Sequence, residues 1–241
     1  MSCSDDETAN EVEIVVKLHA SCDLGVTSIA REAICSSFAA DLGLPVPEPF
    51  IVKIDPEFAN ALPNSYDNQD VKKSIGLNFG TKILPRGFSV FSSGTIIPAE
   101  LKNVAFDILL FDEFVDNSDR RVDNPNLLWD GKEFAMIDHE MTFPFDQILN
   151  WTPIWQNPHY SLSRPSAGRE HVLRDSLRSF IPDVTKVFSA FRDVPRERLA
   201  EYVDVLPNEW QTDGIRRIPH YLAELQANIE RSIGKVMEAL G

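Results

Sequence analysis

Carboxylate and amide side chains crowd the segment DNSDRRVDNPN at residues 116–126. Within it Asp119 precedes Asn124 by five residues, and Asp138 follows a second apolar run. Carboxylates held close together repel one another unless a cation compensates them. Mg²⁺ takes oxygen ligands, commonly one or two carboxylates completed by phosphate and water. A further Asp, kept off the metal, can accept the proton of an attacking hydroxyl, so the pattern indicates phosphoryl transfer.

A β-hairpin would bring these side chains together. The apolar runs LLW and KEFAMI flank a DG dipeptide at 130–131, which is typical of a two-residue type I′ turn. In that register Asp138 lies opposite Asp123 at the open end of the hairpin. Asn124 and Asn126 then lie beside this pair of carboxylates. The alternative is a plain turn, because Asp and Asn are common in loops; an EF-hand calcium loop is excluded because its glycine is missing.

The elements around this segment change in type along the chain. The predicted strands cover residues 11–20, 50–54 and 74–85; the predicted helices cover 29–43, with Thr27 or Ser28 as the N-cap, 98–117 and most of the chain after 145. Strands followed by helices favour an α+β protein of two lobes. We expect a disordered tail at 1–10, a truncated β-rich small lobe at 11–86 and a mainly helical large lobe at 87–241 that carries the hairpin.

The chain is strongly acidic, with 37 Asp and Glu residues against 23 Lys and Arg and a formal net charge of −14. This charge argues against a nucleic-acid partner, which needs a basic footprint, and against docking on anionic membranes. The three cysteines, Cys3, Cys22 and Cys35, lack the spacing of a disulfide framework or a zinc site. Because no signal-peptide pattern and no run of about 20 apolar residues is present, we expect a cytoplasmic protein.

Three segments resemble the HipA-like kinase domain, a branch of the two-lobed kinase fold related to phosphatidylinositol kinases. They are IVVKL with REAICSSFAADLGLPVPEPFIVKID, then SIGLNFGTKIL, and then DRRVDNPNLLWDGKEFAMIDHEMTF. The resemblance implies a kinase-like fold that binds ATP and Mg²⁺ and transfers the γ-phosphoryl group to a hydroxyl. Serine or threonine of a protein is the implied acceptor, and family members act in bacterial toxin–antitoxin modules.

The resemblance also implies a role for single residues. Asp119 matches the catalytic aspartate, Lys17 the strand lysine that contacts phosphate, Glu32 its helix partner and Asp138 the metal aspartate. Asp-His-Glu stands where ordinary protein kinases have Asp-Phe-Gly. The metal asparagine is Asn124 by its spacing from Asp119, or Asn126 by its place just before the strand.

The chain departs from kinases ahead of Lys17, where the sequence is short and holds no glycine for a turn over the phosphates. The loop SCDLGVT at 21–27 is either a phosphate cradle or a plain connector. The alternative to an active kinase is therefore a catalytically weak pseudokinase that acts as a protein-interaction module. A third option is a metal-dependent hydrolase on the same acidic cluster, which would release phosphate without an acceptor.

Overall fold

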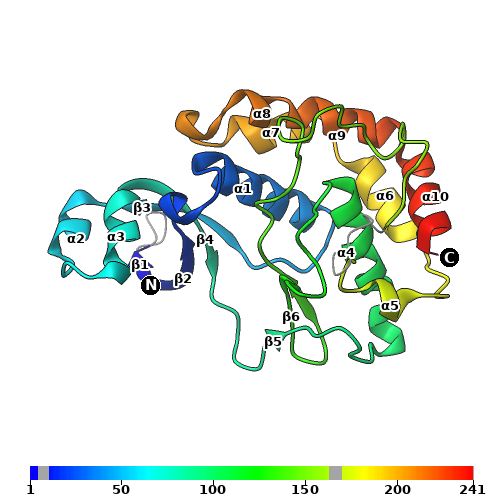
Figure 1. Ribbon diagram of the computed structural model, residues 1–241, viewed down its shortest axis with the longest axis horizontal. Coiled ribbons are helices and arrows are strands. Elements are labelled where there is room, and N and C mark those ends of the chain that lie inside the picture. Colours follow the sequence, from blue (N-terminus) through cyan, green and yellow to red (C-terminus); the bar gives the residue numbers. More distant parts are fainter. Residues whose placement is uncertain (5–10, 163–169, 241) are drawn as a thin grey trace.

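The computed structural model describes residues 1–4, 11–162 and 170–240. A mainly β small lobe lies on the left of Figure 1 and a mainly helical large lobe on the right, with helix α1 (Val26–Asp41) between them. The two ends of the chain lie far apart on opposite sides. The predicted two-lobed α+β fold is confirmed. In the described part of the chain, no helix is long and apolar enough to cross a membrane.

The small lobe is built on a four-stranded antiparallel sheet with the strand order β1-β2-β4-β3. Its strands are β1 (Ser2–Ser4), β2 (Glu11–Lys17), β3 (Pro49–Ile54) and β4 (Gly76–Lys82). The three predicted strands are thereby confirmed to within a few residues. Residues 2–4, which we expected in a disordered tail, pair with β2 instead, with Ser2 opposite Glu13. The rest of that expected tail, 5–10, lies outside the described residues.

Gly80 allows the strands of this sheet to pack closely at its centre. It pairs with Val16 on β2 and with Phe50 on β3. A Cβ atom at this position would stand 2.6 Å from Ile14 Cγ2 and 2.8 Å from Val52 Cγ2. Both distances are shorter than carbon atoms tolerate, so the glycine in GLNFGTK serves strand packing.

Helix α1 begins one residue after Gly25, whose φ of 56° suits glycine. The expected N-cap, Thr27 or Ser28, lies inside the helix because Gly25 turns the chain earlier. Within the loop at 21–27 the N–H groups of Gly25 and Thr27 donate to the carbonyl oxygens of Cys22 and Leu24, each at 3.2 Å. This supports the plain connector over the phosphate cradle.

Most of the remaining helices form the large lobe. The small lobe adds η1 (His19–Ser21), α2 (Pro56–Ala61) and α3 (Tyr66–Lys73); the large lobe has η2 (Ala99–Leu101), α4 (Lys102–Phe114), α5 (Arg174–Leu177), α6 (Thr185–Asp193), α7 (Arg196–Asp204), η3 (Asn208–Trp210), α8 (Asp213–Arg216), α9 (Ile218–Ala227) and α10 (Ile229–Leu240). Helix α1 contacts β3 and β4 as well as α7 and α8. Its Phe38 packs on Phe111 and Phe191, so one hydrophobic core includes α1 and the large-lobe helices. The lobe boundary at residues 86–87 stays a prediction.

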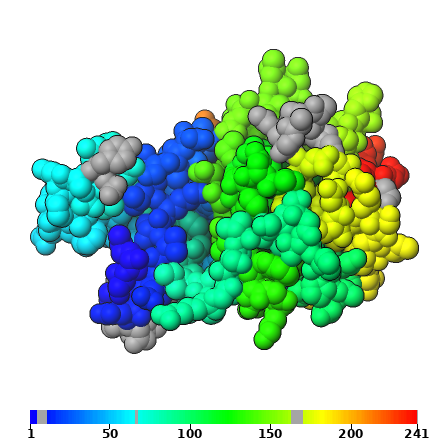
Figure 2. Space-filling model, turned by 60° about the horizontal axis from the view of Figure 1, so that its bottom comes forward, coloured from blue at the N-terminus to red at the C-terminus, as the bar shows by residue number. Residues whose placement is uncertain are grey.

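A second, three-stranded sheet holds the predicted hairpin. It consists of β5 (Ser89–Val90), β6 (Leu127–Trp129) and β7 (Phe134–Met136), in that order. Figure 2 shows the chain after β4 crossing from the blue and cyan small lobe to the green large lobe. There β5 pairs with β6. The sheet therefore lies where the chain enters the large lobe.

The hairpin is confirmed, but its predicted two-residue turn is wrong. Trp129 pairs with Phe134, so four residues connect the strands. Asp130 Oδ1 accepts the N–H groups of Lys132 and Glu133 at 2.8 and 3.0 Å, which stabilises the longer loop.

The longer loop shifts the register of the hairpin. Leu127 pairs with Met136, and the Ile137 N–H donates to Asn126 O at 3.1 Å. The expected pairing of Asp138 with Asp123 is therefore wrong, and Asp138 follows the residue bonded to Asn126.

Candidate active site

Lys17 lies at the end of β2 among three carboxylates. Its Nζ is 2.5 Å from Glu32 Oε1, 2.6 Å from Asp138 Oδ1 and 3.5 Å from Glu140 Oε2. The structure thus brings together the strand lysine, the helix glutamate and the aspartate after β7 that the sequence singled out. Glu140 is an addition that the sequence reasoning did not include.

Burial and charge act in opposite directions on this cluster. Burial lowers the pKa of Lys17, but the charges of Glu32 and Asp138 outweigh burial and raise that pKa above its ordinary value. Burial raises the pKa of Glu32, but the contacts of His139 and Lys17 outweigh burial and lower it to about 2. At neutral pH the cluster therefore contains a charged lysine and an ionised glutamate.

Asp119 lies on the loop between α4 and β6 and is held by side-chain amides. Asn124 Nδ2 donates to Asp119 Oδ2 at 2.7 Å, and Asn126 Nδ2 donates to the same oxygen at 3.1 Å. Arg121 Nη2 lies 3.4 Å from Asp119 Oδ1. The structure therefore gathers the predicted catalytic aspartate and both candidate metal asparagines, and it fixes the orientation of the carboxylate.

The backbone is unusual at the open end of the hairpin. Asn126 has a φ of 44° and Asp138 a φ of 59°, values that residues other than glycine rarely adopt. Such conformations cost energy and persist at sites where the surrounding structure imposes them. Both residues lie beside the hydrogen bond from Ile137 to Asn126, so two of the six such non-glycine residues in the described chain are candidate metal ligands.

A fully buried ion pair supports this end of the hairpin. Arg120 Nε donates to Asp112 Oδ2 at 2.6 Å, and both side chains are 0 % exposed. Arg120 Nη1 donates to the carbonyl oxygens of Asn126 and Ile137, the second at 3.0 Å. Asp112 also contacts His171 Nε2 at 2.9 Å. The pair thereby ties α4 and the loop of Asp119 to the hairpin.

A cavity of about 450 Å³ lies between the small-lobe sheet and the hairpin; we call it the inter-lobe cavity. Its apolar walls include Val15, Leu84, Leu128 and Ile137, and its charged end consists of Lys17, Glu32, Asp138 and His139. The volume is typical of a site for a small molecule. An occupant with a flat apolar part and an anionic part would match these two ends.

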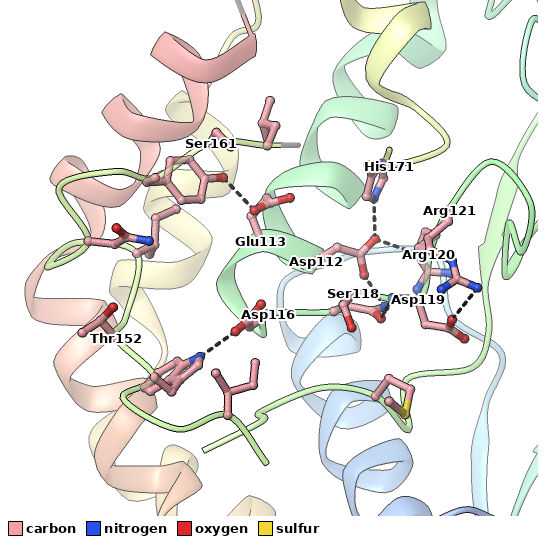
Figure 3. A pocket seen from close by; sticks show the side chains of 18 of the residues that line it. Asp112, Glu113, Asp116, Ser118, Asp119, Arg120, Arg121, Thr152, Ser161 and His171 are labelled. Atoms are coloured by element: carbon pink, nitrogen blue, oxygen red, sulfur yellow. Dashed lines mark hydrogen bonds and ion pairs between the residues drawn. The ribbon is translucent and has the colours of Figure 1, made fainter. Parts of the chain in front are cut away.

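A second cavity of about 540 Å³, the loop cavity, lies on the large lobe. Figure 3 shows Glu113 and Asp116 projecting into it from the end of α4, with Asp119 and Arg121 at its edge. Glu113 accepts from Tyr160 Oη at 2.7 Å and Asp116 from Trp151 Nε1 at 2.6 Å. No described residue lines both cavities, so Asp119 and Lys17 face different spaces.

The structure shows protein partners for the carboxylates of the acidic cluster. We expected a bound dication to compensate the carboxylates, whereas Asp138 is compensated by Lys17 and Asp119 by amides and Arg121. Among the residues described, no group of three or more His, Cys, Asp or Glu could hold a metal. Mg²⁺ needs few protein ligands when phosphate and water complete its shell. Asp138 and one asparagine oxygen would be ligands enough for a metal that arrives with a nucleotide.

Sequence reasoning did not assign functions to four residues at this site. They are Asp112, His139, Glu140 and His171. Asp112 could have been identified from the sequence, because a charged residue within the apolar run VAFDILLFDEFV needs a buried partner. The other three lie in loops, where spacing alone indicates no partner.

The model of the HipA-like kinase family matches residues 7–236 of the chain. The chain belongs to the HipA-like kinase family. Among solved structures, this HipA-like kinase is similar to the Helicobacter pylori proinflammatory kinase CtkA, with a TM-score of 0.50 and 12% identity over 99% of this chain and 91% of that chain. At so low an identity the likeness supports the two-lobed fold alone. No curated protein sequence matches the chain.

We expect this HipA-like kinase to lose stability in acid partly through Glu32. Because the folded-state pKa of Glu32 lies near 2 instead of the ordinary 4.5, its contribution is complete above pH 4.5 and declines as pH falls toward 2. Urea unfolding between pH 7 and pH 2.5 measures this, and the variant Glu32→Gln should show a shallower decline below pH 4.5. Equal acid declines in both proteins would contradict the assignment.

Proposed function

We propose that the protein is a kinase that transfers the γ-phosphoryl group of ATP to a hydroxyl, with serine or threonine of a protein as the acceptor. One observation carries the proposal: Lys17 and Asp138 line the inter-lobe cavity, whereas Asp119 lines the loop cavity. In phosphoryl transfer the attacking oxygen of the acceptor and the leaving oxygen of ATP lie on opposite sides of the γ-phosphorus. The linings of the two cavities meet at the contact of 3.1 Å between His139 and Arg120, and each cavity would hold one of the two substrates.

The inter-lobe cavity suits ATP in both shape and charge. Val15, which is 58% exposed, and Leu128 offer apolar surfaces for the adenine ring. Lys17 lies at the other end and would contact the phosphates, with Glu32 holding it in place. The nucleotide would thus lie between the lobes, with its terminal phosphate toward the hairpin.

The reaction uses Asp119 as the group that orients and deprotonates the acceptor. The acceptor oxygen bonds to the γ-phosphorus, the bond from that phosphorus to the bridging oxygen breaks, and ADP leaves. The hydroxyl proton passes to the Asp119 carboxylate, whose orientation Asn124 and Asn126 fix. The acceptor would enter through the loop cavity, where Asp119 is reached from the large lobe.

Mg²⁺, when bound, compensates the negative charge of the phosphates. Asp138 would hold it together with one of the two asparagines. Asn126 is the better candidate, because its carbonyl accepts the Ile137 N–H next to Asp138 in the hairpin. Asn124, which lies five residues after Asp119, is the alternative.

Replacement of Lys17 by Met should weaken binding of Mg-ATP. The variant removes a charge-assisted contact to phosphate, which contributes about 1.5–3 kcal/mol and hence about 10–100-fold in affinity. Calorimetry or a thermal melt measures this, because Mg-ATP at 100 times its dissociation constant stabilises a protein by about 2.7 kcal/mol.

The matched control is Lys53→Met, which removes an exposed lysine of β3 that pairs with Asp55 at 3.0 Å outside the cavity. It should bind Mg-ATP like the wild type. Wild-type protein that neither binds Mg-ATP nor phosphorylates an acceptor by mass spectrometry would favour the protein-interaction module. Release of phosphate with no acceptor modified would favour the hydrolase.

A further inference from the structure

A row of polar groups, all of them buried except the half-buried Lys17, connects the two cavities; we call it the buried polar chain. It runs in the order Lys17, Glu32, His139, Arg120, Asp112 and His171. The first three line the inter-lobe cavity and the last three line the loop cavity. Its central link is the contact of 3.1 Å between His139 Nε2 and Arg120 Nη2.

We propose that His139 is a positioning residue, which fixes the Lys17–Glu32 pair relative to the loop that carries Asp119. The inference rests on the proposed function, because it concerns the alignment of a phosphate-binding lysine with a catalytic aspartate. His139 is only 1% exposed, and no ligand needs to touch it. It acts through Arg120 on one side and Glu32 on the other.

The hydrogen-bonding roles of its neighbours in the buried polar chain decide which ring nitrogen of His139 carries the proton. A guanidinium can only donate, so His139 Nε2 accepts from Arg120 and the ring carries its proton on Nδ1. Nδ1 faces Glu32 Oε2 at 3.4 Å. The ring also packs edge-on against Phe111 with centroids 6.0 Å apart, which holds its plane. A side chain in this place must accept from Arg120 on one end and meet the Glu32 carboxylate on the other.

At its other end, the buried polar chain holds the loop of Asp119 on both sides of that residue. Asp112 Oδ1 accepts from Asn117 Nδ2 at 2.8 Å, and Asp112 Oδ2 accepts from Arg120 at 2.6 Å. Asn117 Oδ1 in turn accepts the Asp119 N–H at 3.1 Å. The position of Asp119 is therefore set by the same groups that hold His139.

Alignment of this kind affects the transition state more than it affects binding. A displacement of about 1 Å between reacting groups can reduce a rate by about 100-fold while substrates still bind. His139→Phe keeps the ring and its packing but removes both polar atoms. We expect its kcat at saturating Mg-ATP and acceptor to fall at least about tenfold, with the dissociation constant of Mg-ATP changed less than about threefold. His139→Gln, which can still accept from Arg120, should recover most of kcat.

A double variant separates positioning from a general loss of structure. If His139 acts through Asp119, then His139→Phe combined with Asp119→Asn should turn over no more slowly than Asp119→Asn alone. Phe191→Leu, which alters a buried ring of α6 packed on Phe38 and Phe114, is the control for stability and should keep the wild-type kcat.

The outcomes separate this proposal from the proposed function. An unchanged kcat in His139→Phe, multiplied losses in the double variant, or a failure of His139→Gln to recover would each overturn the positioning role while wild-type kinase activity stands. Absence of both Mg-ATP binding and phosphoryl transfer in the wild type would overturn the proposed function itself, and the positioning role with it. Loss of kcat in His139→Phe, its recovery in His139→Gln and no further loss in the double variant would together support both the positioning role and the proposed function.

Discussion

Asp119→Asn should reduce phosphoryl transfer by about 100- to 10,000-fold while the protein stays folded and binds Mg-ATP. An amide cannot take the proton of the acceptor hydroxyl, whereas its oxygen can still accept from Asn124 and Asn126 as Asp119 Oδ2 does. The loss should therefore appear in kcat, with little change in the dissociation constant of the nucleotide. Mass spectrometry of the acceptor at saturating Mg-ATP, together with a thermal melt, measures both quantities.

Asp123→Asn is the matched control for that variant. It makes the same chemical change on the same loop, but the Asp123 side chain is 63% exposed and pairs only with Arg121 among the contacts described. Its kcat should stay close to that of the wild type. Comparable turnover in Asp119→Asn and the wild type would remove Asp119 from the reaction.

The main features of the fold could be predicted from the sequence because local patterns determine them. β-Branched runs predicted β2 and β3, and a helical apolar stripe predicted α1, each to within a few residues. The hairpin turn was mispredicted because the side chain of Asp130 competes with backbone hydrogen bonds. That competition cannot be inferred from the dipeptide alone, and it shifted the register by two residues.

The candidate site was predictable only in part. The spacing of Asp119, Asn124 and Asn126 placed them in one loop, and the structure brings them into contact. The compensating charges were not predictable, because Lys17 reaches Asp138 across 121 residues of chain. Electrostatic crowding suggested a dication, and the structure places a lysine distant in the sequence beside Asp138.

The buried residues that support the site also come from distant parts of the sequence. Glu32 comes from α1, His139 from the segment after β7, and Asp112 from α4. Each is a buried polar residue, and burial of a charge is tolerated only with a partner. A single sequence shows that such partners must exist, but the fold decides which residues they are.

Asp112→Asn should be among the most destabilising substitutions in the described chain. The carboxylate is fully buried; burial raises its pKa, but the Arg120 charge and the His171 contact outweigh burial and keep that pKa well below its ordinary value. Removal of one partner of a buried ion pair leaves an uncompensated charge and costs about 3–5 kcal/mol. In a chain of this length that corresponds to a drop in Tm of about 6–20 °C. Thermal and urea unfolding measure the change.

Asp175→Asn is the control for the ion pair, because Asp175 pairs with Arg178 at 3.2 Å where both side chains are more than half exposed. Its effect should stay within about 0.5 kcal/mol. A loss below about 1 kcal/mol in Asp112→Asn would mean that Arg120 finds another anion or water. In that case Asp112 would not anchor the loop of Asp119, and the two sides of the site would have to be aligned by the hairpin alone.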